Sequence, residues 1–336
     1  MNIGQSESTP LIHQVAVKNA RRVKYFEDLA EIKASQRDFK AAKVGDCGYI
    51  TFTSDNVEID TLIAPIKKHS NKNHRIRGEP YASNITNFLS RPKRGTYLFN
   101  LHDVNEVDGA MGFGHKQSTH AGIVPDFYQM NNYNGNLQNK DEFAFASKLP
   151  KVIFAGASTG SESYNLREND RINYCKYVAE RALTDLSMCN FYLTNVVQMT
   201  PQDVKRYVKS DDIFRRMFHD PIKIGDQLAC KYIMSIDGNA AAWDRPIWIM
   251  NSNSLLFEAP RKYEMWYSSF MRDSEHYIQV EKENIANAFN FCESNPTICE
   301  NIIGNAHKFV KDYAEYTHGY EYLHFFLEEL AHLNSP

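Results

Sequence analysis

The sequence predicts an α/β fold with a parallel sheet in its second half. From residue 151 onward, short apolar segments alternate with amphipathic segments, which is typical of strands that alternate with helices. Small and polar residues follow several of these apolar segments, as expected where a buried strand ends in a loop. With 336 residues, of which 43% are hydrophobic and 24% charged, the chain is long enough for two globular domains.

The first half has a less regular pattern. Residues 14–42 carry apolar residues at mostly helical spacing, and residues 48–64 alternate in the manner of a strand or hairpin. The run 96–103 is typical of a buried parallel strand, and the glycine-containing stretch 104–122 predicts a long loop. Residues 131–139, rich in Asn and Gly, predict a linker or an exposed turn.

The second half predicts a clear order of elements. Strands are expected at 151–156, 191–199, 231–237, 254–259 and 276–281. Helices are expected at 169–183, 202–217, 241–253, 263–271, 283–293 and 296–317, with a last helix after Gly319. Thr200 is expected to cap the second helix, because Pro201 and Asp203 follow at the matching positions. Ligands bind such sheets at the carboxyl ends of the strands, so the loops after them are the candidate sites.

Several function classes are disfavoured. A net charge of −3 argues against a nucleic-acid binder that relies on bulk charge. No G-x-G-x-x-G follows a strand, which argues against a dinucleotide-dependent oxidoreductase. The N-terminus lacks the pattern of a signal peptide, and no run reaches the roughly 18 apolar residues of a membrane span. Six cysteines without a C-x-x-C pair predict reduced thiols, so we expect a cytoplasmic protein.

The turn after the strand 151–156 is the first candidate anion site. Its small residues let backbone N–H groups approach an anion, and its hydroxyls can add hydrogen bonds. No Gly-Lys-Ser/Thr follows, so it is not a P-loop, and a plain tight turn is the alternative. The candidate binding residues are Gly156, Ala157, Ser158, Thr159 and Gly160.

The loop after the strand 231–237 is the second candidate. Arg245 can offer a bidentate fork to phosphate oxygens, although an ion pair with Asp244 or another carboxylate is the alternative. Trp243 can stack on a sugar or a base. The candidate residues here are Asp237, Gly238, Asn239, Ala241, Trp243 and Arg245.

A third candidate lies in the first half, at Asn100–Asp103. Asp103 follows an apolar strand, where a carboxylate can serve as a general base. The same position also suits a helix cap or a turn residue, and the local pattern leaves both interpretations open.

These segments, in this order, resemble glycosyltransferase family 90, the group that includes CAP10-type capsule proteins, lipopolysaccharide glycosyltransferases and protein O-glucosyltransferases. The resemblance runs from about residue 96 to about residue 315. The segments that carry it are NLHD, VPDFYQM, VIFAGASTGS, DRINYC, SIDGNAAAWDRPIWIMNSNSLLFE and YEMWYSSFM followed by HYIQVE.

The resemblance implies a GT-B fold, in which two Rossmann-like domains face each other across a cleft. The acceptor-side domain would span residues 1–145, with a C-terminal helix at 319–334 packing on it, and a nucleotide-sugar domain would span 146–318. The implied reaction moves a sugar, glucose or xylose, from a UDP-sugar to a hydroxyl of a glycan, a lipopolysaccharide or other lipid-linked glycan, or a glycoprotein, with inversion and without a metal cofactor. The implied setting is the cytoplasm of a bacterium or of a virus-infected host, or the membrane periphery.

The resemblance also assigns roles to residues. Asp103 would be the catalytic base and Arg245 would hold the diphosphate, while Arg171 would contact the nucleotide or stabilise the fold. Glu258 would lie on the donor side, and His102 and Asp126 on the acceptor side.

The sequence departs from the family pattern in two places. Where the family often has Arg in the first turn, this chain has Ala155 or Ser158, and His102 stands where the acceptor motif has Arg. The first departure bears on donor affinity and the second on acceptor identity. The alternative function is a catalytically inactive module of the same fold that binds a nucleotide or a glycan, and the presence of Asp103 and Arg245 argues against it.

Overall fold

The computed structural model divides the chain into two compact units. It describes residues 8–23, 25–26, 47–52, 57–61, 95–100, 111–116, 121–138, 141–160 and 165–333. Unit 1 comprises Met1–Asn134, Tyr263–Ser268 and Asp312–Pro336, and unit 2 comprises Gly135–Lys262 and Ser269–Lys311. The boundary expected from the sequence, between residues 145 and 146, falls inside unit 2 of this division.

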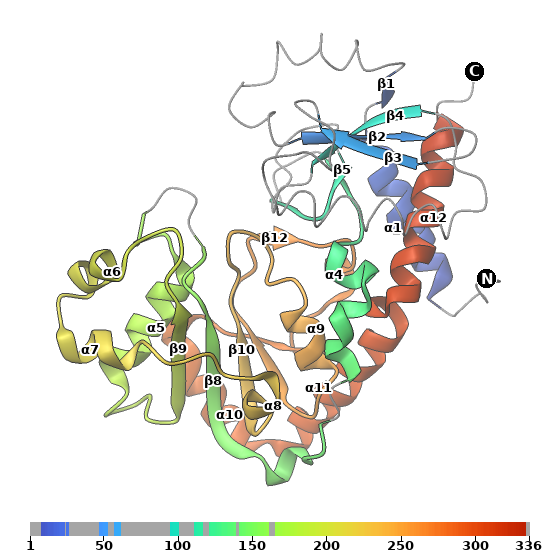
Figure 1. The fold of residues 1–336 in the computed structure, drawn as a ribbon. Coiled ribbons are helices and arrows are strands. Elements are labelled where there is room, and N and C mark those ends of the chain that lie inside the picture. The colour runs from blue at the N-terminus through green and yellow to red at the C-terminus, as the bar shows by residue number, and fades with distance from the viewer. Residues whose placement is uncertain are drawn as a thin grey trace. The chain divides into compact units, whose positions relative to one another are not determined.

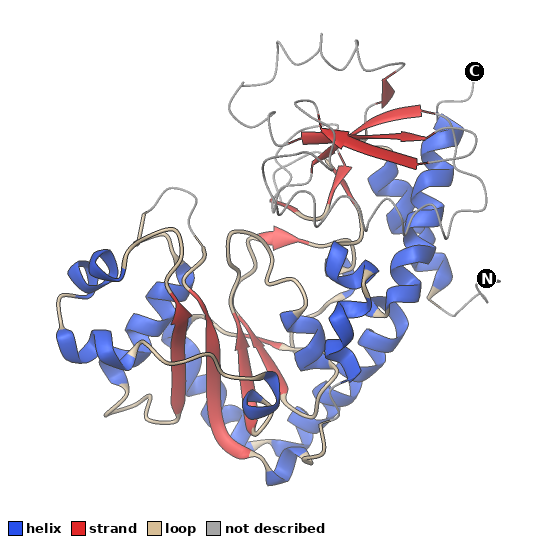
Figure 2. Ribbon diagram, in the orientation of Figure 1, coloured by secondary structure: helices blue, strands red, loops and turns tan. Residues whose placement is uncertain are grey.

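Unit 2 is built on a five-stranded parallel sheet with the strand order β13-β11-β10-β8-β9. Helices lie on both faces of this sheet (Figure 1, Figure 2), as in an α/β fold. The strands are β8 (Leu149–Ala157), β9 (Cys189–Asn195), β10 (Cys230–Ser235), β11 (Leu255–Glu258) and β13 (Ile278–Gln279). The α/β class with a parallel sheet is therefore confirmed.

The helices of unit 2 begin where the sequence supplies caps. Asn169 caps α5 by accepting from the Ile172 N–H, and Thr200 and Asp203 form the expected capping box of α6. The single helix expected at 202–217 is wrong, because Lys209 takes a left-handed conformation and Ser210 caps a new helix. The helices are α5 (Asp170–Arg181), α6 (Pro201–Val208), α7 (Asp211–Arg216), α8 (Ile224–Gln227), α9 (Arg245–Met250), α10 (Ile285–Ser294) and α11 (Pro296–Phe309).

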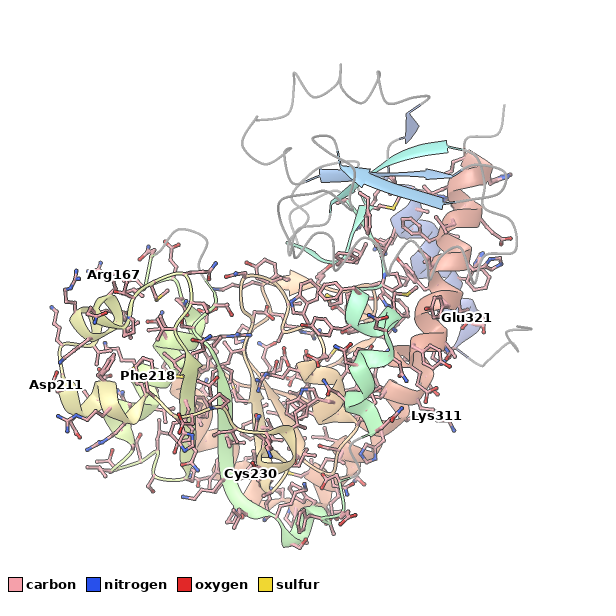
Figure 3. The ribbon with its side chains drawn as sticks, viewed as in Figure 1. Arg167, Asp211, Phe218, Cys230, Lys311 and Glu321 are labelled. Carbon is pink, nitrogen blue, oxygen red and sulfur yellow. The ribbon has the colours of Figure 1, made fainter. Side chains whose placement is uncertain are left out.

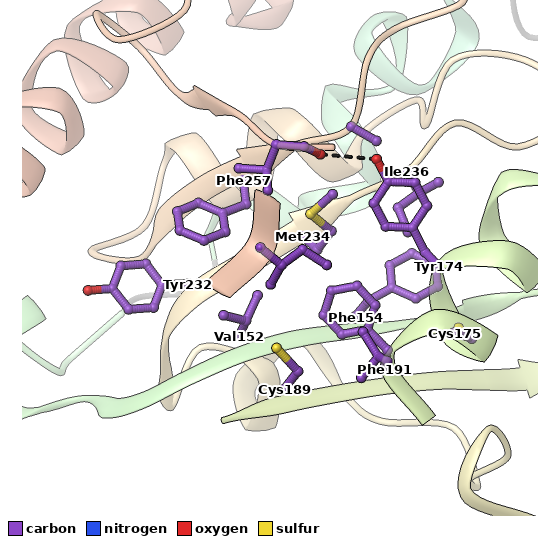
Figure 4. Close-up of a cluster of buried hydrophobic side chains, with 14 of the residues drawn as sticks. Val152, Phe154, Tyr174, Cys175, Cys189, Phe191, Tyr232, Met234, Ile236 and Phe257 are labelled. Carbon is purple, nitrogen blue, oxygen red and sulfur yellow. Dashed lines mark hydrogen bonds between the residues drawn. The ribbon is translucent and has the colours of Figure 1, made fainter. Parts of the chain in front are cut away.

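Apolar side chains from strands and helices meet in the core of unit 2 (Figure 4). Phe154, Tyr232 and Phe257 are fully buried, and the Tyr174 hydroxyl donates to the Val280 carbonyl at 3.0 Å. Burial of each such side chain stabilises the fold by about 1.5–3 kcal/mol. Beyond α7, Phe218, which Figure 3 labels, forms a parallel bridge with Leu193 of β9 and so extends the sheet locally.

Unit 1 has a mixed sheet rather than a second parallel one. Its order is β3-β2-β4-β5-β7, with β1 also pairing with β4. The β2–β3 hairpin is confirmed, but β2 and β1 run antiparallel to β4, whereas the resemblance implied a second Rossmann-like sheet. The strands are β1 (Tyr25–Phe26), β2 (Cys47–Phe52), β3 (Val57–Thr61), β4 (Gly95–Asn100), β5 (Met111–Gly112), β6 (His115–Lys116), β7 (Gly122–Ile123) and β12 (Tyr263–Glu264), the last paired with β6.

Two helices of unit 1, α1 (Thr9–Ala20) and α12 (Tyr316–Leu333), pack against each other (Figure 1). Thr9 donates to Glu321, and Arg21 pairs with Glu329 at 2.8 Å. The helix expected at 14–42 is wrong in part, because α1 ends at Ala20 and β1 pairs with β4 instead. Here tertiary pairing outweighs the helical spacing of the apolar residues.

The chain before α12 also differs from expectation. A π-helix at Val310–Ala314 follows α11, and the Tyr133 hydroxyl and Gln129 side chain donate to the Ala314 carbonyl. Gly319 lies inside α12 rather than at a helix start. A Cβ there would meet the Gln129 side chain at 3.0 Å, so glycine suits this close approach. Gln129 belongs to the segment of α4 (Phe127–Met130), which a 3₁₀ turn (Asn132–Gln138) follows.

Candidate functional site

The turn after β8 is held by its own polar groups. Ser158 is buried, and its hydroxyl donates to the Val197 carbonyl at 3.0 Å while accepting from the Val197 N–H at 2.8 Å. The Asn169 side chain donates to the Ser158 carbonyl at 2.7 Å. Gly160 has a φ of +145°, and its N–H donates to Asn239 Oδ1 at 3.0 Å. The Ser158 hydroxyl therefore fixes the turn, and Asn239 joins this turn to the loop after β10.

Arg171 joins the same two loops from the first turn of α5. Its Nε donates to the Ile236 carbonyl at 3.1 Å, and one terminal nitrogen donates to the Ala157 carbonyl and Thr159 Oγ1 at 3.2 and 2.7 Å. A Cβ at Gly238 would lie 2.8 Å from Thr159 Oγ1 and 3.2 Å from Arg171 Cζ. Glycine at this position therefore allows the two loops and the guanidinium to approach closely.

Arg245, at the start of α9, reaches the same edge of the sheet. It donates to the Ala155 carbonyl at 2.6 Å and to Gln227 Oε1 at 3.4 Å. The Phe154 ring lies under both guanidiniums, 5.3 Å from Arg245 Cζ and 5.9 Å from Arg171 Cζ. We call Arg171 and Arg245 the arginine pair.

The arginine pair carries positive charge that the described residues do not neutralise by direct contact. Neither guanidinium has a carboxylate oxygen within 4.0 Å in the part of the chain that the structure describes. Asp244, the neighbour of Arg245, accepts instead from the Asn136 side chain at 2.7 Å. Burial and the positive charge of Arg245 lower the pKa of Arg171 to about 10. An anion bound here would relieve this repulsion.

Two buried carboxyl groups lie near the arginine pair, since the charge of Asp237 acts on Arg171 and that of Glu258 on Arg245. Asp237 accepts from the Lys262 N–H at 2.9 Å, whereas Glu258 is 1% exposed and its Oε2 has no hydrogen-bond partner. Burial raises the pKa of Glu258 to about 8, Arg261 opposes this shift, and Asp237 adds to it. With so little exposed surface, Glu258 is not placed to contact a ligand directly.

Comparison with models of known protein families shows which family this chain belongs to. The model of glycosyl transferase family 90 matches residues 161–335, just over half of the sequence. The chain belongs to glycosyl transferase family 90.

Two relatives and one solved structure are similar to this family 90 chain. Uncharacterized protein 035R of Invertebrate iridescent virus 3 is 23% identical over 56% of the chain and 17% of that protein. O-glucosyltransferase LpsA of Dichelobacter nodosus is 25% identical over 52% of the chain and 47% of that protein. The chain thus matches less than half the length of either relative. Anabaena Alr3699/HepE in complex with UDP-glucose is 13% identical, with a TM-score of 0.39 over 64% of this chain and 58% of that one.

The structure brings most of the predicted donor-side residues of this family 90 chain to one edge of the unit 2 sheet. They follow the carboxyl ends of β8 and β10, where Arg171 joins them from α5. Trp243 and Ala241 lie half-buried in the loop before α9, and Trp243 has a positive φ of 51°. The candidate residues gathered here are Gly156, Ala157, Ser158, Thr159, Gly160, Arg171, Asp237, Gly238, Asn239, Ala241, Trp243 and Arg245.

Of the predicted acceptor-side residues, Asp126 belongs to unit 1 and the others are not among the described residues. Asp126 is buried in unit 1, where its Oδ1 accepts from the N–H groups of Tyr128 and Gln129 at 2.7 and 3.0 Å and caps α4. His102 and Asp103 lie outside the described residues.

Sequence reasoning missed two basic residues that follow β11. Arg261 donates to the Tyr277 hydroxyl at 2.6 Å, and Lys262 pairs with Asp170 at 2.5 Å while its N–H donates to Asp237. The signal was available, because both residues follow directly on the carboxyl end of a predicted strand.

The described residues were also compared with the requirements of a membrane-spanning helix and of a metal site. None of their helices is long and apolar enough to cross a membrane. In the same part of the chain, no group of three or more His, Cys, Asp or Glu side chains is arranged to hold a metal ion.

Proposed function

We propose that this chain transfers a sugar from a UDP-sugar to an acceptor hydroxyl with inversion at the anomeric carbon. The observation that carries the proposal is the arginine pair, two half-buried guanidiniums with no carboxylate within 4.0 Å among the described residues. A diphosphate matches this charge and can accept from both arginines. Family membership and the similarity to an O-glucosyltransferase favour glucose as the sugar, and xylose is the second candidate by family resemblance.

In the proposed reaction the acceptor oxygen bonds to the anomeric carbon as the bond from that carbon to the diphosphate breaks. The leaving UDP takes the electron pair, and Arg171 and Arg245 stabilise its growing negative charge. Asp103, assigned by resemblance, takes the proton of the acceptor hydroxyl. Fixed cations supply the charge stabilisation in this scheme, so we propose that no metal is required.

The acceptor and the location form the remaining part of the proposal. We propose a glycan, a lipid-linked glycan or a glycoprotein as the acceptor, and the cytoplasm of a bacterium or of a virus-infected host as the setting. The relatives from Dichelobacter nodosus and an invertebrate iridescent virus are consistent with either host. Fractionation of expressing cells would separate a cytoplasmic protein from one held at the membrane periphery.

The test measures hydrolysis and binding of a UDP-sugar panel without acceptor and with EDTA present. Wild type is compared with Asp103→Asn, Arg245→Gln and the matched control Arg167→Gln, which removes an exposed arginine of the same unit. We expect slow UDP release from one sugar by wild type, its loss in Asp103→Asn, and UDP binding weakened about tenfold or more in Arg245→Gln. The Arg167→Gln control should bind as wild type does.

The outcomes separate the two candidate functions. Binding of UDP without turnover, even when acceptors are supplied, would favour the inactive binding module. If wild type binds neither UDP nor any UDP-sugar, the proposed donor site is wrong.

A further inference from the structure

Arg245 has a carboxylate as its neighbour in the chain, yet the two side chains do not pair. The sequence alone leaves an ion pair between Asp244 and Arg245 open. An arginine can reach the carboxylate of an adjacent residue, as Arg181 does with Glu180 at 3.7 Å in the same unit. Asp244 has no oxygen within 4.0 Å of the Arg245 guanidinium, and its Oδ2 accepts instead from Asn136 Nδ2 at 2.7 Å.

The segment that carries Asn136 is bonded to both ends of α9. Asn136 donates to Asp244, which precedes the helix, and the Leu137 carbonyl accepts at 3.0 Å from the side chain of Asn251, which follows it. Residues 132–135, directly before Asn136, all have a positive φ, which side chains other than those of Gly and Asn rarely adopt. Such a backbone persists only where surrounding contacts fix it. The fold therefore determines where the Asn136 amide lies.

An ion pair between Asp244 and Arg245 would change what the arginine pair can bind. The carboxylate would occupy N–H groups that a diphosphate needs, and its negative charge would oppose a bound anion. Asp244 already acts on Arg245 without this contact, since its charge raises the pKa of Arg245 against the effect of burial. Asn136 gives the same carboxylate a neutral donor in place of the guanidinium.

We propose that Asn136 is a positioning residue for the arginine pair: it holds Asp244 away from Arg245 and so leaves this guanidinium available to an anionic ligand. Asn136 acts through Asp244 and not by contact with the ligand. This inference rests on the proposed function, because it takes a diphosphate to be the ligand of the arginine pair.

The test is a set of calorimetric titrations of the full chain with inorganic pyrophosphate and with UDP. Wild type is compared with Asn136→Ala, Asp244→Asn and the double variant, and Asn301→Ala on an exposed part of α11 is the matched control. We expect Asn136→Ala to bind both ligands about tenfold more weakly, because Asp244 then competes for Arg245. Asp244→Asn should bind as wild type does or more tightly, since a negative charge is removed. The double variant should bind within about twofold of Asp244→Asn, and Asn301→Ala as wild type does.

The double variant separates an effect through Asp244 from damage to the fold. If Asn136→Ala and the double variant lose affinity equally, the effect does not pass through Asp244 and the inference is wrong. Equal pyrophosphate binding by wild type and Asn136→Ala would also overturn it, and would leave the proposed function intact. Weaker binding by Asp244→Asn than by wild type would mean that Asp244 supports the ligand, which contradicts the inference whether or not Asn136→Ala folds. If wild type binds neither ligand, the proposed function and this inference fail together.

Discussion

The two edges of the unit 2 sheet differ in whether their buried cations have a carboxylate in contact. At the amino edge, Lys148 precedes β8 and pairs with Asp141 at 2.6 Å, with side chains 0% and 3% exposed. Asp141 also accepts from the Asn253 N–H at 2.8 Å, so this charge is neutralised and tied to the backbone. At the carboxyl edge, Arg171 and Arg245 lie over the same Phe154 ring without a carboxylate in contact among the described residues. The buried cation of the amino edge has a carboxylate partner in contact, whereas we propose that the cations of the carboxyl edge take theirs from a ligand.

The largest expected effect is at the amino edge. We expect Asp141→Ala to lower the free energy of unfolding by about 3–5 kcal/mol, because it leaves a buried ammonium without its partner. Urea unfolding followed by circular dichroism measures this change. The matched control is Asp211→Ala, which breaks an exposed pair with Lys205 and should cost about 1 kcal/mol or less. Equal losses in the two variants would contradict the contrast between buried and exposed pairs.

The carboxyl edge should respond to pH through Glu258. Its pKa is raised from 4.5 to about 8 by burial, against the charges of Arg261 and Arg245 and together with that of Asp237. A raised pKa means that the fold favours the protonated form, so this stability is complete below the unfolded pKa and is lost as pH rises toward 8. We expect the wild-type unfolding free energy to fall across this window and that of Glu258→Gln to fall less. Parallel pH profiles would mean that Glu258 is ionised in the fold.

A smaller effect tests the close approach of the two loops. We expect Gly238→Ala to cost about 1–3 kcal/mol, because its Cβ would lie 2.8 Å from Thr159 Oγ1 and displace Arg171. The control Gly304→Ala lies inside α11 with nothing within 4 Å of the added Cβ, so it should stabilise by about 0.5–1 kcal/mol. Thermal unfolding of both variants checks the signs. A Gly238→Ala protein as stable as wild type would mean that the loops after β8 and β10 shift apart at little cost to accommodate the added methyl group.

The parallel sheet of unit 2 could be predicted because its signals are local. The strands alternate with helices along the chain, and the cap of α6 is formed by Thr200 and Asp203, three residues apart. The loops of the candidate site followed from the same reasoning, since the carboxyl ends of parallel strands share one edge. The cavity lined by Asp170, Ala259 and Glu281 did not, because the start of α5 and the segments after β11 and β13 meet there only in the folded chain.

The errors arose where distant contacts decide the local structure. The spacing of residues 263–271 suits a helix, but they form β12 and a 3₁₀ turn at Ser268–Phe270. Trp266 is buried there, and its indole N–H donates to Gln129 at 2.7 Å, 137 residues earlier in the chain. Gly319 marks contact with that same Gln129 rather than a helix boundary. The sequence pattern around Trp266 or Gly319 does not reveal a contact with a residue so distant in the chain.

The division of the chain into units has a consequence for how this protein can be altered. The backbone passes between unit 1 and unit 2 four times, after Asn134, Lys262, Ser268 and Lys311. No single breakpoint in the gene can therefore exchange one unit for that of a relative. A single crossover would therefore mix parts of both units, so we expect this protein to diverge by point substitution rather than by exchange of whole units.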